Sequence, residues 1–458
     1  MSIERSDRPV ALIILAAGVG TRMNSDLPKP LHPLGSVPLI WHALVAGGRL
    51  NPARIVVVTG QGADVVEAAV AQLTPEAVCV RQAEQLGTAH AVLQAAPALE
   101  GFNGDALVLY ADTPFITETT LRNMLFARAH HDIVVLGFEA EDPGRYGRLI
   151  VQDGDLHRIV EAKDATEAEL AVTTCNSGLL CGDAQAMLSL LPKVGNTNAA
   201  KEYYLTDLPG LARAEGMTAT VILCDEAETR GINSRAELAE AERVFQAAKR
   251  REMQENGVSM QAPETVYFAL DTVIGRDAIV EPNVVFRPGV TVESGAYIRA
   301  FSHLEQCHVS HGAIVGPYAR LRPGAEIGNN AKIGNFVEVK SAEIGEGAKV
   351  NHLSYVGDAT IGEGANLGAG TVTCNYDGVM KHKTVVGKGA FIGSDTMLVA
   401  PVTIGDDAMT ASGSVITEDV PDGALALGRA RQVNKPGLAV KLMARLRAMK
   451  AAMTDRKG

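Results

Sequence analysis

Cysteine, aromatic residues and long apolar runs are all scarce in this sequence. The six cysteines stand far apart, and none belongs to a C-x-x-C pair or to a zinc-ligand spacing, so we expect reduced thiols instead of a disulfide framework or a structural zinc site. The apolar run near the N-terminus, Val10 to Ala17, has the length of one strand and is too short for a membrane span or a signal-peptide core. These absences predict a cytoplasmic protein without stable membrane insertion.

An excess of positive charge is also missing. Lys and Arg number 42 against 53 Asp and Glu, which gives a net charge of −11. A general nucleic-acid binder is normally basic, so the sequence argues against a nucleic-acid partner. What is present is a globular composition with 47% apolar residues. The length of 458 residues allows two or three domains of roughly 100–200 residues each.

Up to about residue 235, short apolar runs alternate with amphipathic stretches. The runs predict buried strands at Val10–Leu15, Ile55–Thr59, Ala106–Tyr110 and Ile133–Phe138, with helices at residues 63–72 and 89–96. This alternation indicates an α/β domain, residues 1–234, with a mostly parallel, Rossmann-like sheet covered on both faces. In residues 235–256, apolar residues spaced by three and four predict a helix that either links two domains or closes the first one.

From about residue 272 an apolar residue recurs every sixth position, beginning with Ile274, Val280 and Phe286 and, after one-residue slips and one interruption, ending at Ile404. An α-helix cannot keep such a stripe on one face, because 3.6 residues per turn do not divide six evenly. A triangular coil with one short strand and one corner per six residues explains the period. Residues 257–458 therefore predict a left-handed parallel β-helix of hexapeptide repeats followed by a C-terminal tail.

A glycine-rich turn follows the first predicted strand, in the segment Ala16–Met23. Glycine lets backbone N–H groups face a phosphate without a Cβ in the way. The turn is not a Walker A loop, because no G-K-[S/T] follows, and not a dinucleotide fingerprint, because Met23 stands where the third glycine belongs. A plain turn is the alternative, but Lys29 in the segment Leu27–Leu31 adds a positive charge that can reach the same phosphates.

The pattern L-A-A-G-x-G-T-R-M followed by P-K resembles the sugar-1-phosphate nucleotidyltransferases. Further matching segments follow in that family's order, at residues 82–90, 110–112, 146–148, 159–161, 176–178, 202–207 and 231–233. With the β-helix, nearly the whole chain resembles the bacterial bifunctional family that joins N-acetylglucosamine-1-phosphate uridylyltransferase to glucosamine-1-phosphate N-acetyltransferase. The first residues and the tail from about Ala430 match poorly.

The resemblance implies two reactions that make UDP-N-acetylglucosamine, a precursor of peptidoglycan and lipopolysaccharide. The second domain would transfer acetyl from acetyl-CoA to glucosamine-1-phosphate, and the first would transfer uridylyl from UTP to N-acetylglucosamine-1-phosphate. The nucleotide would be held by Leu15, Ala16, Ala17, Gly18, Lys29, Gln82, Gly87, Thr88, Tyr110, Ala111 and Asp112. The sugar would be held by Gly147, Glu161, Asn176 and Asn233, and Mg²⁺ by Asp112 and Asn233.

Several β-helix coils carry side chains that a structural repeat does not need, and the long interruption opens at Cys374. Insertions in solenoids often lie on the binding face. His352 is the candidate general base, because an amine must lose a proton as it attacks a thioester and imidazole titrates near neutral pH; Glu338 is a candidate to orient it. The resemblance implies the same base, with the acceptor sugar phosphate held by Arg322, Lys340, Tyr355 and Asn366. It implies that acetyl-CoA contacts Ala369, Asn375, Tyr376, Ser394, Ser412 and Arg429.

Four positions depart from the family pattern. Relatives often have Lys in place of Val19, Gly in place of Ala111, Thr in place of Ser177 and Ala in place of Ser412. The valine removes one possible phosphate contact. Because no metal ligand is lost, we expect altered kinetics at most.

The family also implies a homotrimer with acetyl sites between subunits, since a flat prism face offers no deep pocket. From Gly437 on, one apolar helical face surrounded by Lys and Arg predicts a basic amphipathic helix, which packs on its own oligomer or lies on a membrane surface. Two alternatives to the bifunctional enzyme stay open. One is a monofunctional nucleotidyltransferase with a structural or regulatory β-helix, which predicts no acceptor-site residues on the coils; the other is a non-catalytic subunit.

Overall fold

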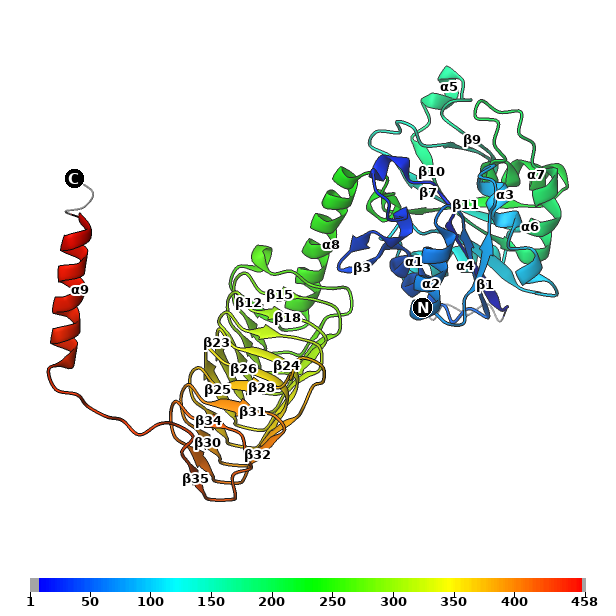
Figure 1. The fold of residues 1–458 in the computed structure, drawn as a ribbon. Helices are drawn as coiled ribbons and strands as arrows, with labels where there is room; N and C mark the ends of the chain where they lie inside the picture. Colours follow the sequence, from blue (N-terminus) through cyan, green and yellow to red (C-terminus); the bar gives the residue numbers. More distant parts are fainter. Residues whose placement is uncertain (1–7, 455–458) are drawn as a thin grey trace. The chain divides into compact units, whose positions relative to one another are not determined.

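The computed structural model describes residues 8–454 and divides into two compact units. The first unit contains the described residues up to Glu252 together with Phe268–Leu270, and the second contains Met253–Tyr267 and the described residues from Asp271 on. Figure 1 shows a sheet flanked by helices in the first unit and a stack of short strands in the second.

The central strands of the first unit are β1 (Val10–Ala16), β4 (Arg54–Thr59), β5 (Val78–Arg81), β6 (Asp105–Tyr110), β7 (Ile133–Glu139), β10 (Thr174–Asp183) and β11 (Ala219–Cys224). They pair in the order β11-β7-β10-β6-β1-β4-β5, and the hairpin β8 (Arg148–Gln152) and β9 (Asp155–Val160) joins through β10. Among the seven central strands, pairing is parallel except at β10, which is antiparallel to β6 and β7. The predicted mostly parallel sheet is therefore confirmed, with one reversed strand in its middle.

The residues of β1 alternate between two hydrophobic cores, one on each face of the sheet. Ile13 packs in the core formed with α3 (Thr88–Leu93), α6 (Ala184–Leu190) and α7 (Leu208–Ala214). Ile14 packs in the core formed with α1 (Leu39–Gly48), α2 (Ala63–Leu73) and α4 (Glu118–Arg128). Burial of each such side chain contributes about 1.5–3 kcal/mol, so both faces need their helices.

The predicted strands and the first predicted helix are present with ends shifted by one or two residues. The segment 89–96 is helical only as far as Leu93, and Pro97 begins a separate 3-10 turn.

Helix α8 (Arg235–Glu255) follows the sheet, where the sequence predicts a helix. Its residues Ala241 and Phe245 are buried with Leu34 and Leu39 in a small core of the first unit. Gly35 has a φ of 56°, and a Cβ there would lie 2.5 Å from the Phe245 ring. Glycine therefore lets this turn pack directly on the helix.

The second unit is a parallel β-helix with three columns of strands, which begin with β12 (Ser259–Met260), β13 (Val273–Ile274) and β15 (Val285–Phe286). Among the described residues, the strands of these columns pair in parallel, as β14 (Ile279–Val280) does with β17 (Tyr297–Ile298). The residues of the six-residue stripe, from Ile274 to Ile404, are at most 6% exposed. They form the inner stack of the coils, as the period predicts.

Successive coils are offset by 17 or 18 residues, which is the spacing of the pairs His352/Asn335 and Glu338/Arg320. The long interruption is a loop between β28 (Val372–Cys374) and β29 (Thr384–Val386). The predicted tail helix is present as α9 (Leu438–Thr454), and its described side chains are exposed.

Candidate active sites

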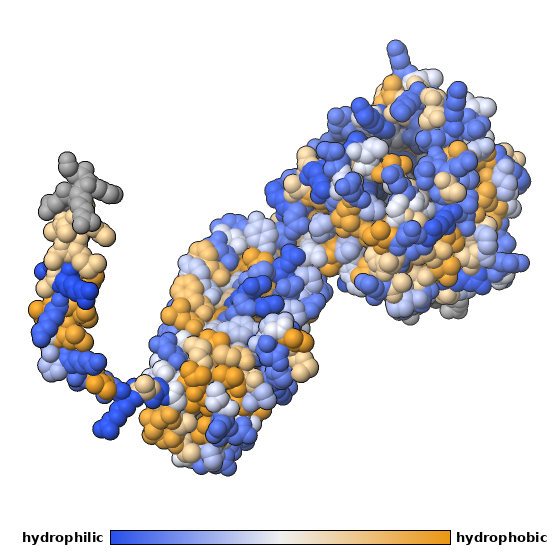
Figure 2. Space-filling view, viewed as in Figure 1, coloured by the Kyte–Doolittle hydropathy of each residue, from blue (hydrophilic) through white to orange (hydrophobic). Residues whose placement is uncertain are grey.

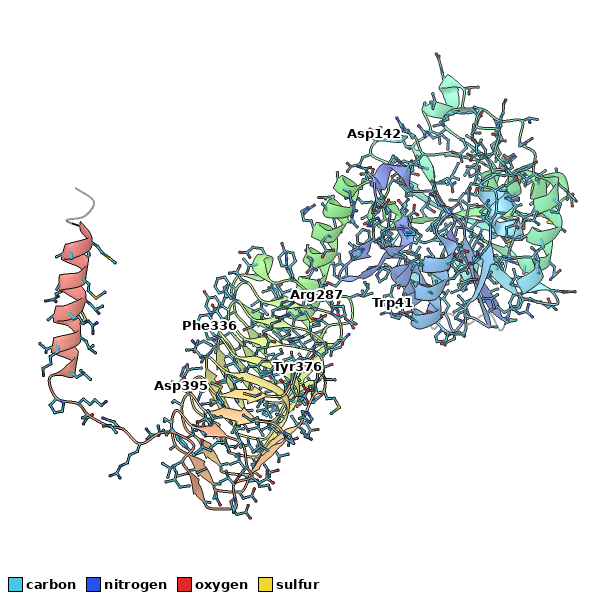
Figure 3. All side chains as sticks on the ribbon, in the orientation of Figure 1. Trp41, Asp142, Arg287, Phe336, Tyr376 and Asp395 are labelled. Carbon is cyan, nitrogen blue, oxygen red and sulfur yellow. The ribbon has the colours of Figure 1, made fainter. Side chains whose placement is uncertain are left out.

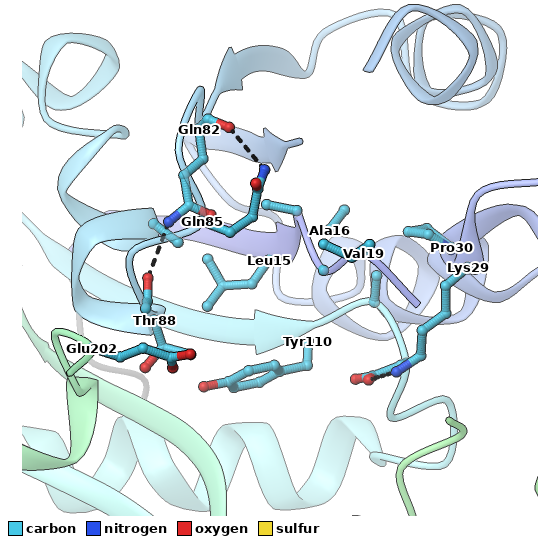
Figure 4. A pocket seen from close by; sticks show the side chains of 16 residues that line it. Leu15, Ala16, Val19, Lys29, Pro30, Gln82, Gln85, Thr88, Tyr110 and Glu202 are labelled. Carbon is cyan, nitrogen blue, oxygen red and sulfur yellow. Dashed lines mark hydrogen bonds and ion pairs between the residues drawn. The ribbon is translucent and has the colours of Figure 1, made fainter. Parts of the chain in front are cut away.

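A cavity of about 290 Å³ opens in the first unit where β1 and β6 end. All eleven residues predicted to hold the nucleotide line it, together with Val19, Pro30, Gln85, Ala91 and Glu202. Figure 4 shows Gln82 and Thr88 at one end of this cavity, Lys29 at the other, and Leu15 and Tyr110 between them. Carboxyl ends of parallel strands are the usual ligand-binding edge of an open α/β sheet.

The Gln82 end of the cavity is rigid. The buried Gln82 amide donates to the carbonyl of Gly87 at 3.0 Å and lies 3.0 Å from Nδ1 of His90. Gly87 has a φ of 116°, and a Cβ there would lie 2.5 Å from the carbonyl oxygen of Tyr203, so this position requires glycine. Thr88 accepts a hydrogen bond of 3.0 Å from the N–H of Leu205. The amide and hydroxyl groups are thus held ready for a polar ligand such as a base.

At the other end, Lys29 forms an ion pair with Asp112 and donates a hydrogen bond of 2.8 Å to Oδ1 of Asn233. The backbone brings Asp112 and Asn233 together, because the N–H of Ile232 donates to the carbonyl of Asp112 at 2.9 Å. Gly20, with a φ of 64°, packs against the Lys29 side chain. A carboxylate and an amide oxygen therefore converge on one positive charge.

These oxygens fit Mg²⁺, which prefers hard oxygen ligands and binds through one or two carboxylates plus water and substrate phosphate. Within residues 8–454, no group of three or more His, Cys, Asp and Glu side chains is arranged to hold a metal ion. Asp112 and Asn233 are the residues that would hold the ion.

The other residues predicted for the sugar, Gly147, Glu161 and Asn176, lie together. A Cβ at Gly147 would be 3.5 Å from a Glu161 carboxylate oxygen and 3.6 Å from Cβ of Asn176, and the Asn176 N–H donates to the Gly147 carbonyl at 2.8 Å. Burial raises the pKa of Glu161, and the nearby Asp164 and Asp207 raise it further, while a hydrogen bond from Thr206 lowers it.

Three departures from the family pattern fall in this unit. Val19 is 46% exposed where it lines the cavity. Ala111 is buried, and the hydroxyl of Ser177 donates to the carbonyl of Leu136 at 2.7 Å. The serine is therefore engaged with the backbone, and only Val19 offers an open side chain to a ligand.

In the β-helix, His352 and three residues predicted for acetyl-CoA stand in one file along a corner. The carbonyl of His352 accepts a hydrogen bond of 3.2 Å from the N–H of the residue after Ala369, one coil later. In the same way, the carbonyl of Ala369 accepts from the residue after Ser394, and the carbonyl of Ser394 accepts from the residue after Ser412, both at 2.7 Å. Ser412 is the next member of this file. Figure 3 shows Phe336 and Asp395, the neighbours of this file, along one edge of the stack. Because neighbouring strands are about 4.8 Å apart, the file can follow an extended ligand.

Arg322, Lys340 and Tyr355 lie on the face formed by β21 (Arg320–Leu321), β24 (Glu338–Ile344) and β26 (Tyr355–Ile361). Asn366 lies on a different face, paired with Lys349 of β25 (Lys349–His352). His352 ends β25 and therefore stands at the boundary between the two faces. One chain does not bring all four predicted acceptor residues together.

The remaining predicted acetyl-CoA residues lie near the long loop and the last coils. Asn375 is buried, donates to Asp358 and lies 3.4 Å from the Tyr355 hydroxyl. Tyr376 is 60% exposed, and its hydroxyl donates to the carbonyl of Gly378 at 2.6 Å. Arg429 is exposed and passes 3.9 Å from the Cβ position of Gly413, beside Ser412.

Sequence reasoning missed Asn335, Asp358 and Lys381. Asn335 contacts His352, with 2.6 Å between Oδ1 and Nδ1. Glu338, the candidate to orient His352, accepts a hydrogen bond of 2.8 Å from Arg322, and its orienting role stays a prediction. The 17-residue coil offset was the signal that could have identified Asn335. Asp358 accepts a hydrogen bond of 3.4 Å from Lys340. Asp358 and Lys381, which belongs to the long loop, both line a second cavity on the surface of the β-helix.

Comparison with known families agrees with this architecture. A MobA-like NTP transferase domain matches residues 12–187, and the bacterial transferase hexapeptide matches residues 271–306, 306–341 and 383–418. Fold and site together define a nucleotidyltransferase joined to a left-handed β-helix transferase. The described residues contain no helix of the length and hydrophobicity that crossing a bilayer requires.

Full-length relatives narrow this class. The chain is 69% identical to the bifunctional protein GlmU of Jannaschia sp. (strain CCS1), over 98% of this chain and 99% of that protein. It is 65% identical to that of Ruegeria sp. (strain TM1040), over 96% and 98%, and 63% identical to that of Paracoccus denitrificans (strain Pd 1222), over 97% and 99%. The chain belongs to the GlmU family of bifunctional proteins. The predicted family is confirmed, and the monofunctional alternative is set aside.

Proposed function

We propose that the chain makes UDP-N-acetylglucosamine in two consecutive reactions. The β-helix, residues 257–458, acetylates glucosamine-1-phosphate with acetyl-CoA, and residues 1–234 join the product to UTP and release pyrophosphate. The observation that carries the proposal is the single cavity that contains all eleven expected nucleotide-binding residues, with Lys29, Asp112 and Asn233 converging at one end. The relatives' bifunctional name supports the pairing of activities.

For uridylyl transfer, a phosphate oxygen of the sugar phosphate attacks the α-phosphorus of UTP, and the bond to pyrophosphate breaks. Such a step depends on positioning and charge neutralisation more than on covalent catalysis. Gln82 and Thr88 orient the base, and Gly147, Glu161 and Asn176 orient the sugar. Lys29 balances phosphate charge; Mg²⁺, when bound by Asp112 and Asn233, adds further positive charge.

For acetyl transfer, the amine nitrogen attacks the thioester carbonyl, the carbon–sulfur bond breaks and CoA leaves as the thiol. His352 takes the proton that the amine loses and returns it to the leaving sulfur. Arg322 and Lys340 supply positive charge for the sugar phosphate, and the file of Ala369, Ser394 and Ser412 guides acetyl-CoA toward His352. Because Asn366 lies on a different face from Lys340, a complete site needs two chains, which supports a homotrimer. The proposed setting is the cytoplasm.

The test separates the two activities by mutation. Asp112→Asn is expected to abolish Mg²⁺-dependent formation of UDP-N-acetylglucosamine and to leave release of free CoA thiol intact. His352→Ala is expected to lower acetyl transfer by about 10²–10⁴-fold and to leave uridylyl transfer intact. Asp142→Asn, at a surface position labelled in Figure 3, and His303→Ala are matched controls. A folded variant that loses both activities, or normal acetylation by His352→Ala, would contradict the proposal.

A further inference from the structure

His352 is held by a side chain from the preceding coil. Its Nδ1 lies 2.6 Å from Oδ1 of Asn335, and the two residues are paired in the register of β25 with β23 (Lys332–Asn335). The N–H of Leu353 also donates to the Asn335 carbonyl at 3.1 Å. Side chain and backbone therefore fix these two residues to each other.

The rest of His352 is held through its backbone. Its carbonyl accepts hydrogen bonds from the Gly370 N–H at 3.2 Å and from the Ser354 hydroxyl at 2.9 Å. The side chain is exposed, and within residues 8–454 the structure records no protein partner for Nε2. Asn335 is thus the group that fixes the ring, while the second ring nitrogen stays open to a ligand.

The nearest alternative to Asn335 is already engaged. Glu338 accepts hydrogen bonds from Arg322 at 2.8 Å and from Arg320 at 3.5 Å. The Glu338 carboxylate is therefore bound by the two arginines of this face, and the imidazole of His352 contacts the uncharged Asn335.

We propose that Asn335 is a positioning residue for the acetyl transfer proposed above, on which this inference rests. Its amide oxygen accepts the proton on Nδ1 of His352, which leaves Nε2 as the nitrogen that receives the proton of the attacking amine. A neutral imidazole carries one proton, and a hydrogen bond at one nitrogen decides which nitrogen is basic. An amide oxygen makes this selection without placing a negative charge beside the base.

Two substitutions test this role. Asn335→Ala removes the acceptor, and we expect kcat for acetyl transfer to fall on the order of tenfold, less than the 10²–10⁴-fold of losing a general base, with KM for glucosamine-1-phosphate nearly unchanged. Asn335→Asp keeps an acceptor but adds a charge that favours the imidazolium. In the pH profile of kcat/KM, the acid limb of the Asn335→Asp variant should therefore move to higher pH by about one unit. The activity of this variant should recover at alkaline pH.

The controls keep this test separate from that of the proposed function. Asn329→Ala changes an exposed asparagine at another corner of the same coil, and uridylyl transfer and the unfolding temperature report folding in every variant. Besides His352 itself, the ionisable side chains on β23, β24, β25 and β26 are Lys332, Glu338, Lys340, Glu343, Lys349, Tyr355 and Asp358. Because they stay in every variant, the change in pH profile reports position 335.

The outcomes are distinguishable. If the unchanged protein does not acetylate glucosamine-1-phosphate, the proposed function fails. If the unchanged protein acetylates glucosamine-1-phosphate and His352→Ala does not, the proposed function stands. Two results would then overturn only the role of Asn335: a wild-type kcat in Asn335→Ala, or an acid limb that stays in place in Asn335→Asp.

Discussion

The carboxyl group of Glu161 is expected to make the proposed uridylyl site sensitive to pH. Burial raises its pKa, the charges of Asp164 and Asp207 act in the same direction, and the hydrogen bond of 3.1 Å from Thr206 opposes them. The protonated form therefore persists at a higher pH than for an ordinary glutamate. In the proposed site this matters, because an ionised carboxylate accepts hydrogen bonds from sugar hydroxyls and a protonated one loses part of that capacity.

We predict that KM for N-acetylglucosamine-1-phosphate rises as the pH falls through the raised pKa of Glu161. Glu161→Gln should have a high KM that no longer depends on pH in this range. Initial rates of uridylyl transfer between about pH 5 and 8 would measure both, with the exposed Glu167→Gln as control. An unchanged pH dependence of KM in Glu161→Gln would show that another group titrates.

At the scale of elements, the β-helix could be predicted almost completely from the sequence. A period of six determines which residue faces inward, and the residues from Ile274 to Ile404 are buried accordingly. The same regularity places Asn335 against His352, one coil later. Glu338 was the candidate from the sequence, and its hydrogen bond with Arg322 depends on side-chain geometry that the sequence does not show.

The site of the first domain was predictable as a set of residues but not as a geometry. The glycine-rich turn and Lys29 are close in the sequence, so their shared role follows from local spacing. Asn233 is 204 positions away from Lys29, and only the fold brings the two within hydrogen-bonding distance. Family resemblance supplied Asn233, because no local pattern distinguishes it from other asparagines.

The long loop between β28 and β29 adds a positive charge to the proposed acceptor site. Lys381 lines a cavity with Asp358, and contact with Lys340 lowers the pKa of Lys381. Asp358 is the carboxylate near both ammonium groups, and Arg322 adds a third positive charge. Two lysines in contact repel each other, and an anion such as a sugar phosphate would relieve that repulsion.

We predict that Lys381→Ala raises KM for glucosamine-1-phosphate roughly tenfold with little change in kcat, because one charge-assisted hydrogen bond contributes about 1.5–3 kcal/mol. Lys388→Ala is the control, since Lys388 is exposed and forms its ion pair with Glu363. Initial rates of thiol release against glucosamine-1-phosphate concentration would measure the effect. A wild-type KM in Lys381→Ala would remove this residue from the acceptor site.

At the scale of the whole molecule, the β-helix exposes apolar side chains that we expect to pack against a second protein chain. Figure 2 shows hydrophobic surface gathered on the C-terminal coils, where Phe391, Met409, Val415 and Leu425 are between 45% and 58% exposed. Scattered apolar residues are normal on a surface, but contiguous ones mark interaction sites. Beside the His352 file, Phe301, Tyr318 and Phe336 form a stacked aromatic ridge with ring centroids 4.8 and 5.2 Å apart.

Each ridge residue has a positive φ and is about half exposed, so the stack is presented outward at the corner. A second chain that covers the ridge would also approach His352 and could supply residues from a different face, such as Asn366. Assembly through the β-helix, as proposed above, would explain both the division of the predicted acceptor residues between two faces and the exposed ridge.

We predict that Tyr318→Asp weakens this assembly and lowers acetyl transfer while uridylyl transfer persists. A buried carboxylate on the ridge would lose its hydration without a partner, and aspartate tolerates the positive φ of 56° at this position. Light scattering and both activity assays across a dilution series would follow the two properties together, and Val273→Asp, 58% exposed on another face, is the matched control.

In the unchanged protein, we expect trimers at high concentration and loss of acetyl transfer before uridylyl transfer on dilution. A stable monomer with full acetyltransferase activity would contradict the trimer, and an intact trimer in Tyr318→Asp would place the interface elsewhere.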